Sequence, residues 1–418
     1  MATTPIGRSV LIYSVAFAVA GATPFVLLPI LTRQLSPQQF GEVTSFLILA
    51  TVLANLAGLS AHGFVSVRYF KSTADDFRGL VTSTTAAVVV AHLVAAVLVA
   101  AFFSQLREAL GLPLGLSLFA VAAALVLSLN LIVLSLFQST GQPLLYLRAR
   151  LIQCAFEFFL CLALLALFVP DAGARIYSYC AAVAASAVFG LHVCLRQRFI
   201  GGGVDRKHLR SLARFGVPML PHIVAGSALA YLDRLMVSSL LGTESLGIFM
   251  VAMQIDMVMV VFIEPLNKAL APWLFEQLAR NEAATRQMIV KRTYLLCGML
   301  AACGVAVAIV ATALFDQLIG ARYVAARPLV PLFVAGFVLQ GMYYTVVNYL
   351  FYAEQTGRLS MMSGLTAIVA CAISYSLTSS FGLVGAGVSF TLANGLLFML
   401  VWFAASRAVA MPWLLGPR

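Results

Sequence analysis

Long apolar stretches recur along the whole chain, and they constrain its fold more than any motif does. A bilayer core about 30 Å thick needs about 20 apolar residues per helix, and stretches of that length follow one another from residue 9 to residue 406. Of the 418 residues, 62% are apolar and only 10% are charged, whereas a soluble domain carries about 25% charged residues. We therefore expect an all-α polytopic membrane protein, because the charges are too few to coat domains of this length in water.

The apolar stretches predict twelve transmembrane helices joined by short connections. The predicted spans are residues 9–31, 42–63, 79–103, 117–138, 148–169, 175–195, 215–241, 247–270, 293–315, 328–351, 360–378 and 384–406. The longest and most basic connection contains three consecutive glycines, Gly201 to Gly203. We expect it to separate an N-terminal six-helix lobe (1–195) from a C-terminal one (215–418), with 196–214 as a basic cytoplasmic linker. Since six is even, both lobes would enter the membrane in the same direction, as parallel repeats do.

The positive charges predict the orientation. Lys and Arg are enriched in cytoplasmic loops. With the N-terminus inside, 19 of the 26 basic residues fall in cytoplasmic segments and 5, among them Arg175, fall in outer ones. Both termini are therefore predicted to be cytoplasmic, and the basic composition does not indicate a nucleic-acid partner. The seven cysteines lie in apolar runs without metal-ligand spacing, so we expect neither a disulfide framework nor a metal site.

Ionisable residues inside the spans are the candidate functional residues, because each costs roughly 2.5–3.5 kcal/mol on insertion scales unless it finds a partner or water. They are Glu157, Asp233, Arg234, Asp256, Glu264 and Lys268. Helical spacing places Asp256, Glu264 and Lys268 along a polar stripe about 18 Å long. It also places His222 and Asp233 on one face, with Gly226 leaving that face open. Structural roles stay open for each: Glu264 and Lys268 could neutralise each other, and Asp233 and Arg234 could bind neighbouring helices.

Three stretches of the sequence resemble the polysaccharide-transporter family. They are SVLIYSVAFAVAGATPFVLLPILTRQLSPQQFGEV, GVPMLPHIVAGSALAYLDRLMVSSLLGTESLGIF and ARYVAARPLVPLFVAGFVLQGMYYTVVNYLFYAEQTGRL. The most specific parts are Pro218, Pro221, Asp233 and Arg234 with the glycines that follow them, and the Tyr-Tyr to Asn-Tyr stretch that begins at Tyr343. The resemblance covers residues 8 to 405. Its bacterial members, the Wzx-type flippases, share a superfamily with lipid II flippases and MATE exporters, so it implies a MATE-like, two-lobed carrier.

The resemblance also implies a function. Such a carrier would flip an undecaprenyl-diphosphate-linked oligosaccharide, for O-antigen, capsule or exopolysaccharide, from the cytoplasmic to the periplasmic leaflet of the bacterial inner membrane by alternating access. It implies membrane lipids, H⁺ or Na⁺ as a coupling ion, and polysaccharide polymerase and chain-length proteins as partners. Arg234, Lys268, Asp233 and His222 become candidates for substrate binding. Glu157, Asp256 and Glu264 become candidates for ion coupling.

Two other functions stay open. A MATE-like, cation-coupled exporter of small molecules would suit the intramembrane charges, because four acids stand against two bases. A membrane-embedded glycan polymerase or ligase is the weaker alternative, since the outer connections 104–116 and 316–327 are short and carry no acid–base constellation. The sequence also lacks a nucleotide-binding G-x-x-x-x-G-K-[ST] loop. We therefore expect a protein that is not an enzyme and needs no cofactor.

Overall fold

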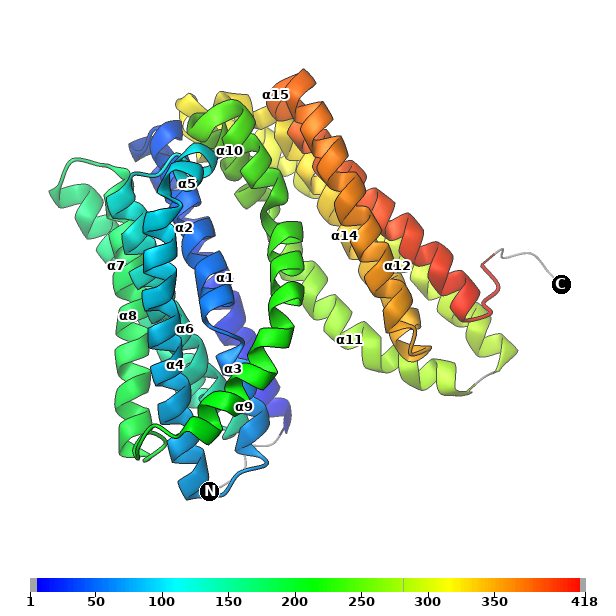
Figure 1. Ribbon diagram of the computed structural model, residues 1–418. Coiled ribbons are helices and arrows are strands. Elements are labelled where there is room, and N and C mark those ends of the chain that lie inside the picture. Colours follow the sequence, from blue (N-terminus) through cyan, green and yellow to red (C-terminus); the bar gives the residue numbers. More distant parts are fainter. Residues whose placement is uncertain (1–5, 281, 414–418) are drawn as a thin grey trace. The chain divides into compact units, whose positions relative to one another are not determined.

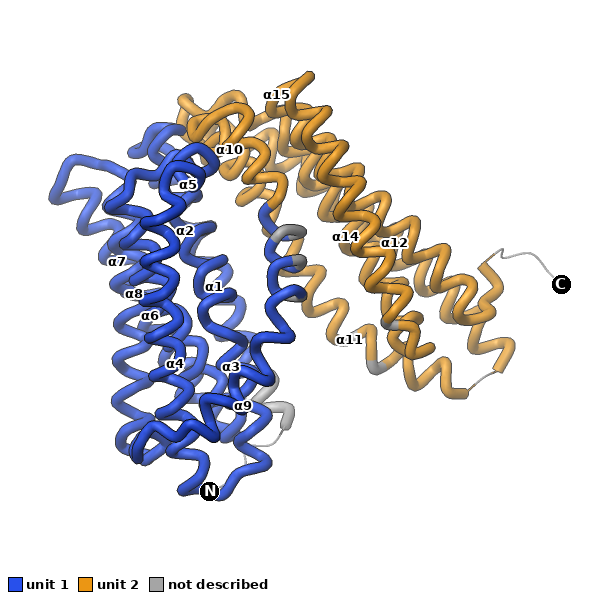
Figure 2. Tube along the Cα trace, viewed as in Figure 1, with its two compact units in different colours: residues 1–231 blue, residues 232–418 orange. Residues whose placement is uncertain are grey.

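The computed structural model describes residues 6–280 and 282–413, and these residues form helices joined by turns and short connections (Figure 1). The contacts between helices divide the chain into two compact units, residues 1–231 and 232–418 (Figure 2). In chain order the elements are α1 (Ile6–Gln34), α2 (Pro37–Ala57), α3 (Ala61–Tyr69), α4 (Ala74–Ala101), α5 (Phe103–Leu110), α6 (Leu114–Ser139), α7 (Pro143–Leu167), α8 (Ala172–Arg196), α9 (Arg206–Gly216), the 3₁₀ turn η1 (Val217–Met219), α10 (Leu220–Asp256), α11 (Val258–Arg280), α12 (Ala283–Ala313), α13 (Phe315–Leu318), the 3₁₀ segment η2 (Ala321–Leu329), α14 (Val330–Tyr352) and α15 (Thr356–Ala408).

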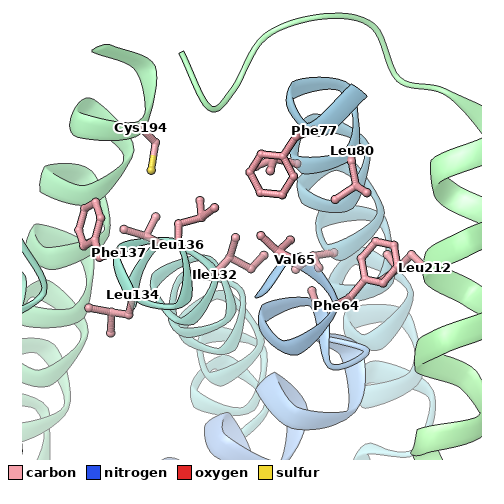
Figure 3. Packing of buried hydrophobic residues seen from close by; sticks show 14 of the residues in the cluster. Phe64, Val65, Phe77, Leu80, Ile132, Leu134, Leu136, Phe137, Cys194 and Leu212 are labelled. Carbon is pink, nitrogen blue, oxygen red and sulfur yellow. The ribbon is translucent and has the colours of Figure 1, made fainter. Parts of the chain in front are cut away.

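The core of unit 1 lies where its short helices meet its long ones. Phe64 of α3, Phe77 of α4 and Phe137 of α6 are buried in one cluster, and Cys194 of α8 packs in it as a small apolar residue (Figure 3). Local capping fixes where the long helices begin. At the start of α2, for example, the Ser36 hydroxyl accepts the Gln39 N–H at 3.2 Å while the Gln39 side chain accepts the Ser36 N–H at 2.8 Å, which satisfies two otherwise unpaired donors.

The connection predicted as a linker is docked onto unit 1. Its second part forms α9, which packs against α3 and α4 and buries Leu212 in the core cluster (Figure 3). Two of its backbone N–H groups donate to α4, from Gly201 to Thr82 Oγ1 at 3.1 Å and from Asp205 to Ser83 Oγ at 3.0 Å. The division between the compact units falls later, between Tyr231 and Leu232 of α10. The lobe boundaries at 195 and 215 stay a prediction.

Two of the helices in unit 2 reverse direction at glycines with positive φ. Gly242 of α10 has φ 86° and Gly382 of α15 has φ 59°, a region that favours glycine. Arg234 contacts Met253 across the first reversal at 2.8 Å, although 19 residues of straight helix would separate them by about 28 Å. At the second reversal, Gly385 lies so close to the Leu377 carbonyl that a Cβ there would overlap it. Each of these long helices therefore contains two limbs.

These reversals account for the number of spans. In the part of the chain that the structure describes, eleven helical segments are long and apolar enough to cross a membrane, and the last one, Gly357–Ala408, contains both limbs of α15. That segment corresponds to the predicted spans 360–378 and 384–406. The expected all-α, polytopic, two-lobed fold is confirmed, and the chain is a multi-pass membrane protein.

Two predicted spans differ from the helices in detail. The stretch 42–63 is not one helix, because α2 ends at Ala57 and α3 begins at Ala61. The stretch 247–270 is also interrupted, since α10 ends at Asp256 and α11 begins at Val258, with Met257 in a turn. Apolar periodicity continues through both breaks, which is why hydropathy did not reveal them.

Candidate functional site

Asp233 and Arg234 lie on the first limb of α10, and the chain reversal at Gly242 positions them opposite its second limb. The Asp233 carboxylate accepts the backbone N–H of Arg234 at 2.9 Å, and its Oδ1 lies 3.5 Å from Arg234 Nη1. The Arg234 Nη2 donates to Met253 Sδ at 2.8 Å. Each side chain is only 16% exposed. Asp233 and Arg234 therefore lie against the second limb of α10. The Arg234 guanidinium contacts the Asp233 carboxylate and the Met253 thioether.

Asp256 lies one turn beyond Met253 and differs from every other charged candidate. Its residue is 0% exposed, and neither carboxylate oxygen has a hydrogen-bond partner among the described residues. It is the last residue of α10, where the helix carbonyls present partial negative charge. An ionised, unpaired carboxylate in such a place is strongly unfavourable. The position therefore suits a carboxyl group that holds a proton or a cation.

Glu264 and Lys268 form the expected i,i+4 ion pair on α11, at 3.7 Å. Their side chains are 31% and 68% exposed. The helix break at Met257 separates Asp256 from them, and of the three only Asp256 is fully buried. The polar stripe through all three residues stays a prediction. Beside the pair, Asn348 of α14 donates to Asn267 Oδ1 of α11 at 3.0 Å, an amide contact that sequence reasoning missed.

Glu157 has a partner that sequence reasoning did not predict. Its Oε1 lies 2.6 Å from Arg175 Nη2, and both side chains are only 7% exposed. Arg175 was expected in an outer connection, but it lies inside the first turn of α8 and its side chain reaches α7. Among the described residues, Nη1 of Arg175 has no hydrogen-bond partner. This closed pair favours a structural role for Glu157 over the predicted role in ion coupling.

Unit 1 contains a cavity of about 290 Å³ that sequence reasoning did not find. Its lining residues come from the α2–α3 corner and the first limb of α10: Ala54, Asn55, Ser60, His62, Ile223, Gly226, Ser227, Ala230 and Tyr231. Of the residues predicted on this face, Gly226 does line the cavity, whereas the side chain of His222 lies outside the described part of the structure.

The fold is shared with two kinds of solved structure. A lipid II flippase, MurJ, in an inward closed conformation matches with a TM-score of 0.73 at 13% identity, over 94% of this chain and 87% of that one. A multidrug resistance MATE family transporter of the MOP superfamily, in an inward-facing conformation, matches with a TM-score of 0.66 at 13% identity, over 96% of both chains. This fold defines the class: a helical, multi-pass membrane protein with the same fold as these two structures.

Sequence relatives are consistent with this class. Residues 6–278 match the family model described as polysaccharide biosynthesis protein, and the chain belongs to this family. Lsg locus putative protein 1 of Haemophilus influenzae is 26% identical over 178 residues, which span 41% of this chain and 44% of that protein. An uncharacterized membrane protein of the same organism is 25% identical over 86% of this chain and 87% of its own length. The chain thus spans less than half of the first relative and most of the second.

Proposed function

We propose that this protein is a flippase that moves an undecaprenyl-diphosphate-linked oligosaccharide from the cytoplasmic to the periplasmic leaflet by alternating access. The observation that carries the proposal is the family match over residues 6–278 on a fold similar to that of a lipid II flippase. A repeat unit of O-antigen, capsule or exopolysaccharide is the expected cargo. Polysaccharide polymerase and chain-length proteins are the expected partners, because they would use the flipped product.

Arg234 is the proposed contact for the diphosphate. A guanidinium matches the oxygens of a phosphate with two parallel hydrogen bonds, which a lysine ammonium cannot do. Asp233 would hold the guanidinium in place through the 3.5 Å contact. Lys268 is the proposed first contact at the entrance, since its side chain is 68% exposed. His222 stays a candidate for the same site from its position on the first limb of α10.

Asp256 is the proposed ion-coupling residue, ahead of Glu264 and Glu157. It alone among the three is fully buried and lacks a described partner, whereas Glu264 pairs with Lys268 and Glu157 with Arg175. A buried, neutral carboxyl that ionises when water reaches it would link H⁺, or Na⁺, to the transport cycle. The same observation favours the second candidate function, a cation-coupled exporter of small molecules.

A reconstitution experiment separates the two functions. Purified protein in proteoliposomes is given a fluorescent undecaprenyl-diphosphate oligosaccharide in one arm and a cationic dye in the other. The flippase function predicts protein-dependent exposure of the lipid-linked glycan to an impermeant glycosidase and no accumulation of dye. Accumulation of dye without glycan exposure would overturn the flippase proposal.

The proposed site of action is the bacterial inner membrane, with both termini in the cytoplasm. Nineteen of the 26 basic residues fall on the cytoplasmic side of this topology, in agreement with the positive-inside rule. Reporter fusions after Gly203 and after Arg418 should both report a cytoplasmic location. A periplasmic signal from either fusion would contradict it.

A further inference from the structure

The corner between α2 and α3 forms one wall of the unit 1 cavity, and its backbone is unusual. Leu59 and Ser60 both have left-handed backbone, with φ of 50° and 52°, which non-glycine residues seldom adopt and which packing must hold in place. Gly216 of α9 supplies that packing, because a Cβ there would collide with Leu59. Ser60 is the N-cap of α3, yet its side chain makes no capping hydrogen bond. Ser60 is also a lining residue of the cavity.

The opposite wall is a face of small side chains on the first limb of α10. Ile223, Gly226, Ser227 and Ala230 are spaced at i, i+3, i+4 and i+7, so they share one side of the helix, and all four line the cavity. A Cβ added at Gly226 would meet no atom within 4 Å. This open space at Gly226 is what leaves room for a ligand between the two walls.

The chemistry of the lining is polar but uncharged. Asn55 brings an amide, Ser60 and Ser227 bring hydroxyls, and Tyr231 brings a ring with a phenol group. His62 adds an imidazole that can both donate and accept. None of the described lining residues is a carboxylate or a permanent cation. Such a lining suits neither a diphosphate nor an organic cation, whereas hydroxyls, an amide and an aromatic ring match the hydroxyl groups and C–H faces of a sugar.

We propose that this cavity binds an uncharged sugar ring of the transported glycan, through hydrogen bonds from Asn55, Ser60 and Ser227 and contact with Tyr231. The assignment rests on the proposed flippase function for its biological meaning. It divides recognition of the cargo into two parts. The cavity in unit 1 selects neutral sugars over acidic ones, whereas Arg234 is the contact proposed above for the diphosphate.

The test measures binding, so it does not depend on transport. Purified full-length protein in nanodiscs is titrated with the neutral methyl glycosides of glucose, galactose, rhamnose and N-acetylglucosamine. Methyl glucuronide serves as the acidic counterpart. Saturation-transfer NMR reports which sugar protons contact the protein. Farnesyl diphosphate, which carries no sugar, serves as the probe for the diphosphate site.

Gly226→Leu is the decisive variant, because its side chain would enter the open space of the cavity and leucine favours helix. Gly298→Leu is the matched control, since Gly298 is another helical glycine whose added Cβ meets nothing within 4 Å. We expect Gly226→Leu to weaken binding of the best neutral glycoside at least about tenfold, a change of about 1.4 kcal/mol, and to leave farnesyl diphosphate binding unchanged. Asn55→Ala should weaken binding of the neutral glycoside about three- to tenfold, the range expected for the loss of one hydrogen bond.

Three outcomes would overturn the assignment: equal neutral-sugar binding by Gly226→Leu and Gly298→Leu, preference for the glucuronide, or no binding of any neutral glycoside by wild-type protein. The Gly226→Leu variant could also lose binding of both the neutral glycoside and farnesyl diphosphate while it keeps the wild-type melting temperature. That result would count against a separate sugar site. The flippase proposal would fail in a different experiment. In that case the protein would bind the neutral sugar, yet proteoliposomes that contain it would show no exposure of the lipid-linked glycan.

Discussion

Two buried carboxyl groups, Glu157 in unit 1 and Asp256 in unit 2, have opposite environments. Glu157 lies 2.6 Å from the guanidinium of Arg175, with both side chains 7% exposed. Asp256 is 0% exposed and has no described hydrogen-bond partner. In a low-dielectric interior a paired carboxylate stays charged and acts as a structural link, whereas an unpaired one must be neutralised. A charged partner, and not burial alone, therefore decides which membrane-embedded acid can change its charge during a transport cycle.

The largest effect is expected from breaking the pair in unit 1. Arg175→Met should lower the free energy of unfolding by about 3–5 kcal/mol, because it leaves a buried carboxylate uncompensated. The double variant Glu157→Gln/Arg175→Met should recover most of the loss. Thermal unfolding in detergent measures both, with Arg327→Met as the control, since its ion pair with Asp316 at 3.1 Å is exposed. A double variant as unstable as the single one would contradict the ion-pair role.

Arg234 provides an intermediate case, because its partner carboxylate lies at 3.5 Å and its guanidinium also contacts Met253. Arg234→Ala should reduce flipping of lipid-linked glycan about 30- to 150-fold at normal protein levels, as loss of a charged hydrogen bond of about 2–3 kcal/mol would. Arg234→Lys should retain part of the activity, and Asp233→Asn should harm it less than Arg234→Ala. Full export by Arg234→Ala would return the pair to a structural role.

Asp256→Asn tests the buried acid that has no described partner. In the proposed role Asp256 is protonated at rest, so the uncharged amide replaces an uncharged carboxyl group and stability should change by less than about 1 kcal/mol, in contrast to Arg175→Met. Glycan flipping should lose its dependence on an imposed H⁺ or Na⁺ gradient. Both quantities are measured on the same proteoliposome preparation. Destabilisation as large as that of Arg175→Met would mean that Asp256 has a partner in the folded protein.

The smallest effect is expected at Lys268, whose ion pair with Glu264 is at 3.7 Å and mostly exposed. An i,i+4 pair of this kind contributes about 0.2–0.5 kcal/mol, so Lys268→Ala should leave the melting temperature nearly unchanged. Flipping should fall about twofold to threefold, through a weaker entrance contact. A loss as deep as that of Arg234→Ala would place Lys268 inside the main site instead of at its entrance.

Sequence reasoning recovered the helices well because a bilayer requires about 20 apolar residues for every crossing. The chain reversals at Gly242 and Gly382 fall between predicted spans for the same reason. The turn at Met257 escaped detection because an interrupted helix can keep an unbroken apolar pattern. The partner of Glu157 was missed because Arg175 lies in the first turn of a helix, and hydropathy assigned that edge to a connection.

Apart from the open helix face at Gly226, the unit 1 cavity could not be predicted from the sequence, for a different physical reason. Asn55 and Ser227 line the same space although 172 positions separate them in the sequence. Their proximity depends on how α10 packs against the α2–α3 corner, which no local pattern records. Gly226 was the one available signal, since an open helix face was predicted there, but the sequence did not reveal what lay across from it.

The docking of residues 196–214 onto α4 has a mechanical consequence. A glycine-rich tether would let two bodies reorient at an entropic cost only, but here the chain leaves unit 1 inside a helix, at Tyr231 of α10 (Figure 2). A helix resists flexing and twisting, and it yields mainly where its hydrogen-bond ladder is interrupted. If the two units reorient during transport, we therefore expect α10 to bend along the stretch that carries Gly226, Tyr231 and Arg234.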